Sequence, residues 1–183
     1  MKLNKRGFAS SLYNYSSQSN PRVYLDVSKG ESSLGRMVFE LYKNHVPETA
    51  ANFEAICTGE NESGLTYNGT PFNKVIQGFM AQGGHVSSKD DSSSASIYGE
   101  RFQDEDLSLR HHKRGMLTMS NTGENSNGSQ FMVTFNKANW LDGYQVVFGE
   151  LVEGQDVLAK IEDAGSREGA TQEKIEITGS GSA

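Results

Sequence analysis

The chain is most informative at FNKVIQGFMAQGG, residues 72–84, which begins as an apolar strand pattern and ends in a double glycine. Along an extended chain, side chains alternate between two faces, so every second residue points the same way. One face then carries a cation, an amide and apolar groups: Lys74, Ile76, Gly78, Met80 and Gln82. This pattern predicts a shallow amphipathic patch that holds a peptide without forming or breaking covalent bonds.

A second stretch, MSNTGENSNGSQFM at residues 119–132, supplies more carboxamide side chains and another apolar pair. Its central segment, residues 123–128, lacks the lysine of a phosphate-binding loop, so we interpret it as a polar surface turn. The second stretch therefore extends the predicted peptide-binding surface with hydrogen-bonding groups.

Reactive groups elsewhere in the chain have ordinary structural interpretations. Cys57 falls within the apolar stripe of a predicted helix, which favours a buried, inert thiol over a nucleophile. Residues 111–114, HHKR, have no cysteine or carboxylate at ligand spacing and are interpreted as a solvated basic turn rather than a metal site. The sequence thus argues against covalent, metal or cofactor catalysis, and we expect no cofactor.

Composition narrows the class of protein. The chain has 183 residues, 35% hydrophobic and 22% charged, as expected for one domain with a real core. A net charge of −6 makes a nucleic-acid backbone an unfavourable partner. No stretch approaches the roughly 18 apolar residues of a membrane span. A single cysteine excludes an internal disulfide, which indicates an intracellular, reducing compartment.

The first 20 residues differ from the rest, because they contain Lys2, Lys5 and Arg6, no acidic residue, and many serines and asparagines. A basic, serine-rich leader resembles a mitochondrial transit peptide, in which case the protein is mitochondrial rather than cytoplasmic. A disordered tail and a partner-bound arm remain open alternatives. We therefore divide the chain into an arm at residues 1–20, a domain at 21–179 and a short tail at 180–183.

Short strand patterns follow one another along residues 21–179, separated by turns. Two helical patterns, at residues 47–57 and 154–164, stand far apart between them. The predicted strands lie at residues 23–27, 36–42, 115–120, 130–135, 146–149 and 174–178, and the stretch 72–84 adds a further extended segment. This arrangement predicts a mostly β protein, a closed antiparallel barrel with helices over its ends.

Several motifs are similar to those of the cyclophilin family of peptidyl-prolyl isomerases: FMAQGG at 79–84, NGSQF at 127–131, WLDG at 140–143, VVFG at 146–149, VPETAANF at 46–53 and SIYGERF at 96–102. The resemblance extends over residues 23–177 in one register. It implies an eight-stranded antiparallel barrel capped by two α-helices. It also implies rotation about the bond before proline, with proline-containing polypeptides as partners.

The resemblance assigns roles to individual positions. It implies catalytic roles for Lys74, Gln82 and Asn121. It implies that the following residues bind the substrate, the apolar ones around the proline ring and the amides along the peptide backbone: Phe79, Met80, Ser120, Gln130, Met132, Trp140, Leu141 and Gln145. Phe131 is instead expected in the barrel core.

Three of these positions depart from the family pattern. Lys74 stands where the family has arginine, Met132 where it has phenylalanine and Gln145 where it has histidine. The glycine-rich secondary groove is replaced by residues 91–94, DSSS. Lysine keeps the charge but lacks the planar fork of arginine, so we expect an isomerase of reduced activity. Because Trp140 is retained, we also expect binding of a cyclosporin-type ligand, weakened by Met132 and Gln145.

A second hypothesis also fits these substitutions. The barrel then serves as a weakly active or inactive proline-binding subunit of a larger assembly, docked through residues 1–20. The two hypotheses are compatible, since a weak isomerase can also be a subunit.

Overall fold

The computed structural model describes residues 19–86 and 95–183. Most of the predicted arm and the substituted groove at residues 91–94 therefore lie outside the described residues. Within the described part of the chain, no helix is both long enough and apolar enough to cross a membrane.

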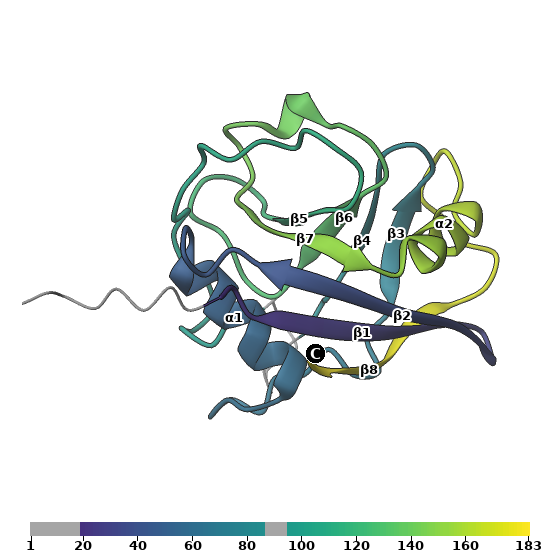
Figure 1. Cartoon of the computed structure of the whole chain (residues 1–183), viewed down its shortest axis with the longest axis horizontal. Coiled ribbons are helices and arrows are strands. Elements are labelled where there is room, and N and C mark those ends of the chain that lie inside the picture. The colour runs from purple at the N-terminus through teal and green to yellow at the C-terminus, as the bar shows by residue number, and fades with distance from the viewer. Residues whose placement is uncertain (1–18, 87–94) are drawn as a thin grey trace, which may run out of the picture.

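Eight strands form one sheet whose neighbours are all antiparallel, in the order β3-β4-β6-β5-β7-β2-β1-β8. The strands are β1 (Arg22–Lys29), β2 (Ser32–Leu41), β3 (Phe72–Ile76), β4 (Met80–Gly83), β5 (Met116–Met119), β6 (Phe131–Thr134), β7 (Val147–Glu153) and β8 (Ile175–Ser182). The sheet curls into a barrel (Figure 1). Among the described residues, one bridge links Pro71, just before β3, to Glu176 of β8. The predicted barrel is confirmed but is nearly rather than fully closed.

Two α-helices, α1 (Pro47–Thr58) and α2 (Gln155–Asp163), lie toward opposite ends of the barrel, as predicted (Figure 1). Helix α1 packs on β8, β1 and β7, and helix α2 packs on β2, β3 and β4. The first N–H groups of α1 receive no side-chain cap from Val46. Glu105 supplies one instead, because its carboxylate accepts from the backbone N–H groups of Glu48 and Thr49 at 2.9 and 2.8 Å.

The barrel interior is filled by aromatic rings. Phe53 of α1 lies 5.0 to 5.1 Å from the rings of Tyr67, Phe131 and Phe148, measured between centroids. Phe131 meets it edge to face and is fully buried, which confirms its predicted place in the core. Cys57 is also buried and free, and burial raises its pKa well above the ordinary value, as expected of an inert thiol.

The stretch at residues 72–84 folds as a hairpin of β3 and β4 rather than as one strand. Phe79 N–H donates to the Ile76 carbonyl at 3.0 Å, and Gly78 has φ of +77°, which a type II turn requires at this position. The reversal places Lys74 opposite Gln82 and Ile76 opposite Met80. Residues directly opposite one another share a face, so the predicted one-sided arrangement survives the turn.

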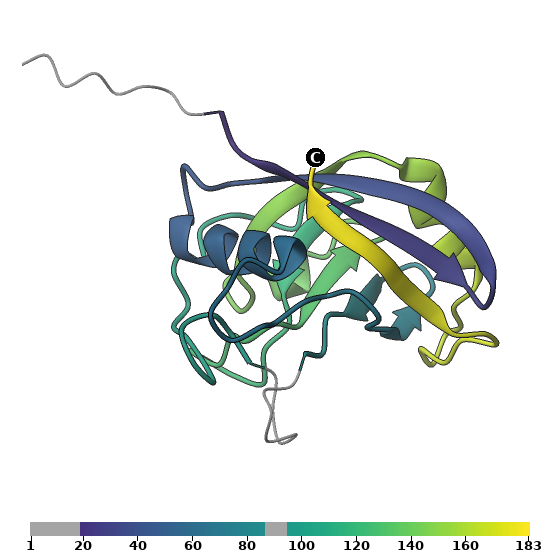
Figure 2. The same ribbon diagram turned by 90° about the horizontal axis from the view of Figure 1, so that it is seen from below.

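Strand β8 extends to Ser182, well past residue 178, where the alternating apolar pattern ends. Residues 180–182, predicted as a tail, pair with β1, and Ala183 N–H donates to the Arg22 carbonyl at 2.9 Å. Figure 2 shows β8, in yellow, lying along β1, in purple. Glycine leaves room for the neighbouring ring, because a Cβ at Gly181 would lie 3.0 Å from the Tyr24 ring, closer than ordinary van der Waals contact.

Candidate active site

The four strands β3, β4, β6 and β5 present two adjacent rows of side chains, one on each side of the barrel wall. The inner row faces the core and consists of Val75, Ala81, Val133 and Leu117. The outer row faces away from the core and consists of Lys74, Gln82, Met132 and Thr118. The members of each row are directly opposite one another on neighbouring strands. Strand pairing therefore places predicted site residues from three strands side by side.

Lys74 lies at the open end of the outer row. Its aliphatic stem passes over Gly169, where a Cβ would lie 2.7 Å from the Lys74 Cγ atom. None of the salt bridges between described residues includes Lys74, and its side chain is exposed. The stem is thus supported while the charge stays available, on the same side of the barrel wall as Gln82.

The carboxamides beside Lys74 form a connected pair. Gln82 Nε2 donates to Gln130 Oε1 at 3.2 Å, and both side chains are partly buried. The Gln130 carbonyl accepts from the Ser120 N–H at 3.0 Å, which ties the pair to the end of β5. Each amide keeps unused donor or acceptor capacity, so the pair can bond an extended peptide backbone.

Apolar side chains border these amides. Met80 and Met132 are buried, and Met132 is directly opposite Gln82. The Phe79 ring lies 5.3 Å from the Trp140 ring between centroids, and Trp140 is 61% exposed. Trp140 and the half-buried Leu141 belong to a short 3₁₀ turn, η1 (Asn139–Leu141). The exposed indole thus contacts Phe79, the residue before the buried Met80, and such apolar surface is suited to hold a proline ring.

Asn121 and Gln145 form a second group of predicted site residues. Both line a cavity of about 660 Å³, and Asn121 Nδ2 donates to the Tyr144 carbonyl at 3.3 Å. Gln145 Oε1 is buried and has no hydrogen-bond partner among the described residues. Ser120, the residue before Asn121, links this group to the amide pair through its backbone bond to Gln130. Within the described ranges, Asn121 and Gln82 share no direct hydrogen bond.

The prediction of a solvated basic turn at residues 111–114 is wrong for its first member. His111 is fully buried, and its Nδ1 and Nε2 atoms lie 2.9 Å from Asp142 Oδ1 and Thr118 Oγ1. Burial lowers the pKa of His111, and the hydrogen bond and charge of Asp142 oppose that shift. His112, the next residue, is exposed. Periodicity does not separate two adjacent histidines, and the acceptor Asp142 lies far along the sequence.

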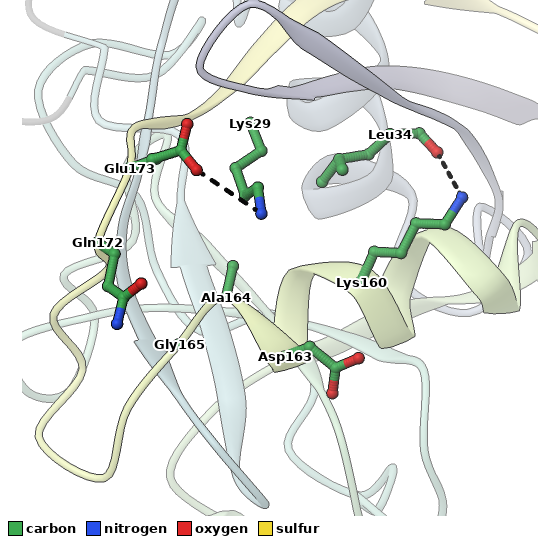
Figure 3. Close-up of a pocket in the computed structure, with 8 residues that line it drawn as sticks. All are labelled: Lys29, Leu34, Lys160, Asp163, Ala164, Gly165, Gln172 and Glu173. Carbon is green, nitrogen blue, oxygen red and sulfur yellow. Dashed lines mark hydrogen bonds and ion pairs between the residues drawn. The ribbon is translucent and has the colours of Figure 1, made fainter.

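A separate hollow lies beside α2 and is drawn in Figure 3. It measures about 310 Å³ and contains no predicted site residue. Lys29 faces Glu173 at 3.7 Å, and Lys160 donates to the Leu34 carbonyl at 3.3 Å (Figure 3). Its cations are engaged with neighbouring groups and it has little apolar surface, so we place the candidate site at the outer row instead.

A comparison with known families agrees with the fold and with the motifs. The model of the cyclophilin type peptidyl-prolyl cis-trans isomerase family matches residues 24–182. The chain therefore belongs to the cyclophilin-type family of peptidyl-prolyl cis-trans isomerases. The match supports a peptidyl-prolyl isomerase function and the binding of proline-containing peptides.

Proposed function

We propose that this chain isomerises X-Pro bonds in polypeptides with Lys74 as the cation at the reacting bond, at a lower rate than an arginine would give. The observation that carries the proposal is the position of Lys74 directly opposite Gln82, with Gln82 bonded to Gln130. A charge and two carboxamides thereby face the same stretch of surface, beside the ring-binding side chains.

The reaction is a rotation about a bond, so the protein need not form or break any covalent bond. Rotation about a peptide C–N bond has a barrier of about 18–20 kcal/mol, and the X-Pro bond relaxes in about 10–100 s unaided. In the twisted state the prolyl nitrogen loses its conjugation and regains a lone pair. A donor near that nitrogen stabilises the twisted state over both planar states, which is what catalysis requires.

Each group then has one task in the proposal. The Lys74 ammonium donates toward the prolyl nitrogen. Gln82 and Gln130 hold the peptide backbone on one side of the bond so that the other side can turn. The proline ring rests on Met132 and Leu141. Asn121, further along the surface, bonds the flanking backbone.

The reduced rate follows from the shape of the cation. An arginine fork can hold a backbone carbonyl and approach the nitrogen at the same time, whereas an ammonium is a point donor. Loss of one charge-assisted hydrogen bond costs about 1.5–3 kcal/mol, or roughly 10- to 150-fold in rate. Met132 adds to the effect, because a flexible thioether confines a proline ring less rigidly than an aromatic wall.

A protease-coupled assay on a short X-Pro peptide tests the proposal. We expect Lys74→Ala to lower kcat/KM at least tenfold below the unsubstituted protein. Lys43→Ala is the matched control, since Lys43 is a surface lysine paired with Glu54 of α1, and we expect it to leave kcat/KM unchanged. Equal activity of the unsubstituted protein and Lys74→Ala would overturn the role of Lys74.

A further inference from the structure

The η1 turn, which carries Trp140 and Leu141, is held at both ends by one residue. Before the turn, Ala138 N–H donates to the His111 carbonyl at 2.9 Å. After the turn, Asp142 Oδ1 accepts from the His111 backbone N–H at 2.8 Å and lies 2.9 Å from His111 Nδ1. Three contacts to a single buried residue thus fix the segment that presents the exposed indole.

The imidazole of His111 also contacts the outer row of the candidate site. His111 Nε2 lies 2.9 Å from Thr118 Oγ1, and Thr118 ends the outer row, directly opposite Met132. Thr118 and His111 are both fully buried, so neither side chain has room to exchange its partners for water. The ring therefore spans the gap between η1 and the strand surface on which the proline ring would rest.

We propose that His111 is a positioning residue of the isomerase site, setting the location of Trp140 and Leu141 relative to Met132. The inference rests on the proposed function for its kinetic consequence, but the placement of Trp140 can be measured without any substrate. His111 touches none of the predicted substrate-binding residues by hydrogen bond in the described chain, so it acts through the turn and through Thr118.

The protons on the two ring nitrogens of His111 define its hydrogen bonds. An ionised Asp142 can only accept, so Nδ1 must carry a proton. In the neutral ring, Nε2 then accepts the single hydroxyl proton of Thr118. That hydroxyl also lies 3.1 Å from the Val146 carbonyl, which already accepts from the Met119 N–H at 2.9 Å. With His111 neutral, the Thr118 proton goes to Nε2 rather than to the Val146 carbonyl, which keeps its bond from the Met119 N–H, and the ring links η1 to β5.

The charge environment keeps this form dominant at neutral pH. Burial is the largest influence on the pKa of His111 and lowers it, while Asp142 acts in the opposite direction. Burial raises the pKa of Asp142, but the hydrogen bonds and charge of His111 and the charge of Arg110 outweigh it and lower the pKa overall. On the side of β5 the ring faces Thr118, which is not titratable in this range.

The test uses His111→Gln, with His112→Gln as the matched control at the adjacent, exposed position. Trp140 is the only tryptophan, so its emission and its quenching by acrylamide report on η1 directly. We expect His111→Gln to change the quenching of Trp140 and to raise KM for an X-Pro peptide about three- to tenfold, with kcat changed less than twofold. His112→Gln should change neither quantity.

Asp142→Asn provides a second variant in case His111→Gln does not fold. Asp142 is only partly buried, so its substitution perturbs the core little, yet it weakens both bonds from His111. The same direction of change in Trp140 quenching supports the proposal. Folded variants with unchanged Trp140 quenching would overturn it. A protein without isomerase activity would refute the proposed function alone, since the fluorescence comparison still decides the role of His111.

Discussion

The inner and outer rows occupy the same four strands, one residue apart, yet they differ in almost every property. All inner-row side chains are apolar and at most 1% exposed. The outer row runs from the exposed Lys74, through the half-buried Gln82, to the fully buried Thr118. Because side chains alternate along a strand, neighbouring residues face the core and the candidate site in turn.

The outer row is not an ordinary solvent face. Its β5 end is covered by a second layer that contains η1 and His111, and its β3 end is open. A peptide can therefore lie where cover gives way to solvent, beside Lys74 and Gln82. We therefore expect substitutions in the inner row to change stability and substitutions in the outer row to change the rate of isomerisation.

The largest expected effect is in the inner row. Leu117→Ala removes a fully buried side chain and should lower the free energy of unfolding by about 2–5 kcal/mol. Urea denaturation measures this loss, and kcat/KM per folded molecule should stay within about twofold. A large loss of activity in folded Leu117→Ala protein would break the separation between the rows.

In the outer row, Gln82→Ala should show the opposite behaviour. We expect kcat/KM to fall about tenfold, because a backbone contact is lost at the turning bond, while the free energy of unfolding changes by less than about 1.5 kcal/mol. Gln77→Ala is the matched control, since Gln77 is exposed in the β3–β4 turn. Equal kcat/KM in the two variants would remove Gln82 from the proposed mechanism.

The pH dependence of stability tests how His111 is held in the layer over the β5 end of the outer row. The folded-state pKa of His111 lies below its ordinary value of 6.5, so the unfolded chain binds its proton more tightly. The contribution of the neutral, buried His111 to the free energy of unfolding is fully present above pH 6.5. It is lost as the pH falls from 6.5 through the lowered folded-state pKa. The slope can reach about 1.4 kcal/mol per pH unit.

Urea midpoints at pH 7.5 and 5.5 measure this contribution. We expect His111→Gln to have a smaller difference between the two midpoints than His112→Gln, because the His112→Gln variant still contains the buried His111. Identical differences for the two variants would mean that His111 does not titrate differently in the folded state.

The smallest expected effect lies outside both rows, at the start of α1. Glu105→Gln removes the charge that binds two backbone N–H groups and should cost about 0.5–1.5 kcal/mol. Thermal unfolding measures it, with the exposed Glu60→Gln as control. Isomerase activity should be unchanged, and a clear drop would show that α1 influences the outer row.

The sequence predicts what depends on local alternation. Strand periodicity and the two helical patterns, at residues 47–57 and 154–164, are local, and they predict the barrel elements well. Periodicity also predicts that Lys74 and Gln82 lie on the same face, even though the chain reverses at Gly78 between them. Family motifs then connect Gln130, which directly precedes β6.

Long-range contacts were not predictable in this way. His111 depends on Asp142, and the start of α1 depends on Glu105, each of them distant along the chain. The end of β8 pairs Gly181 with Tyr24 of β1, although glycine itself disfavours strands. In each case the decisive partner is brought close only by the folded barrel.

The central claim is that the cation opposite Gln82 sets the rate, and Lys74→Arg tests it most directly. We predict that kcat/KM for a short X-Pro peptide rises by about tenfold or more over the unsubstituted protein, with an unchanged free energy of unfolding. An unchanged or lower kcat/KM in folded Lys74→Arg protein would contradict the claim.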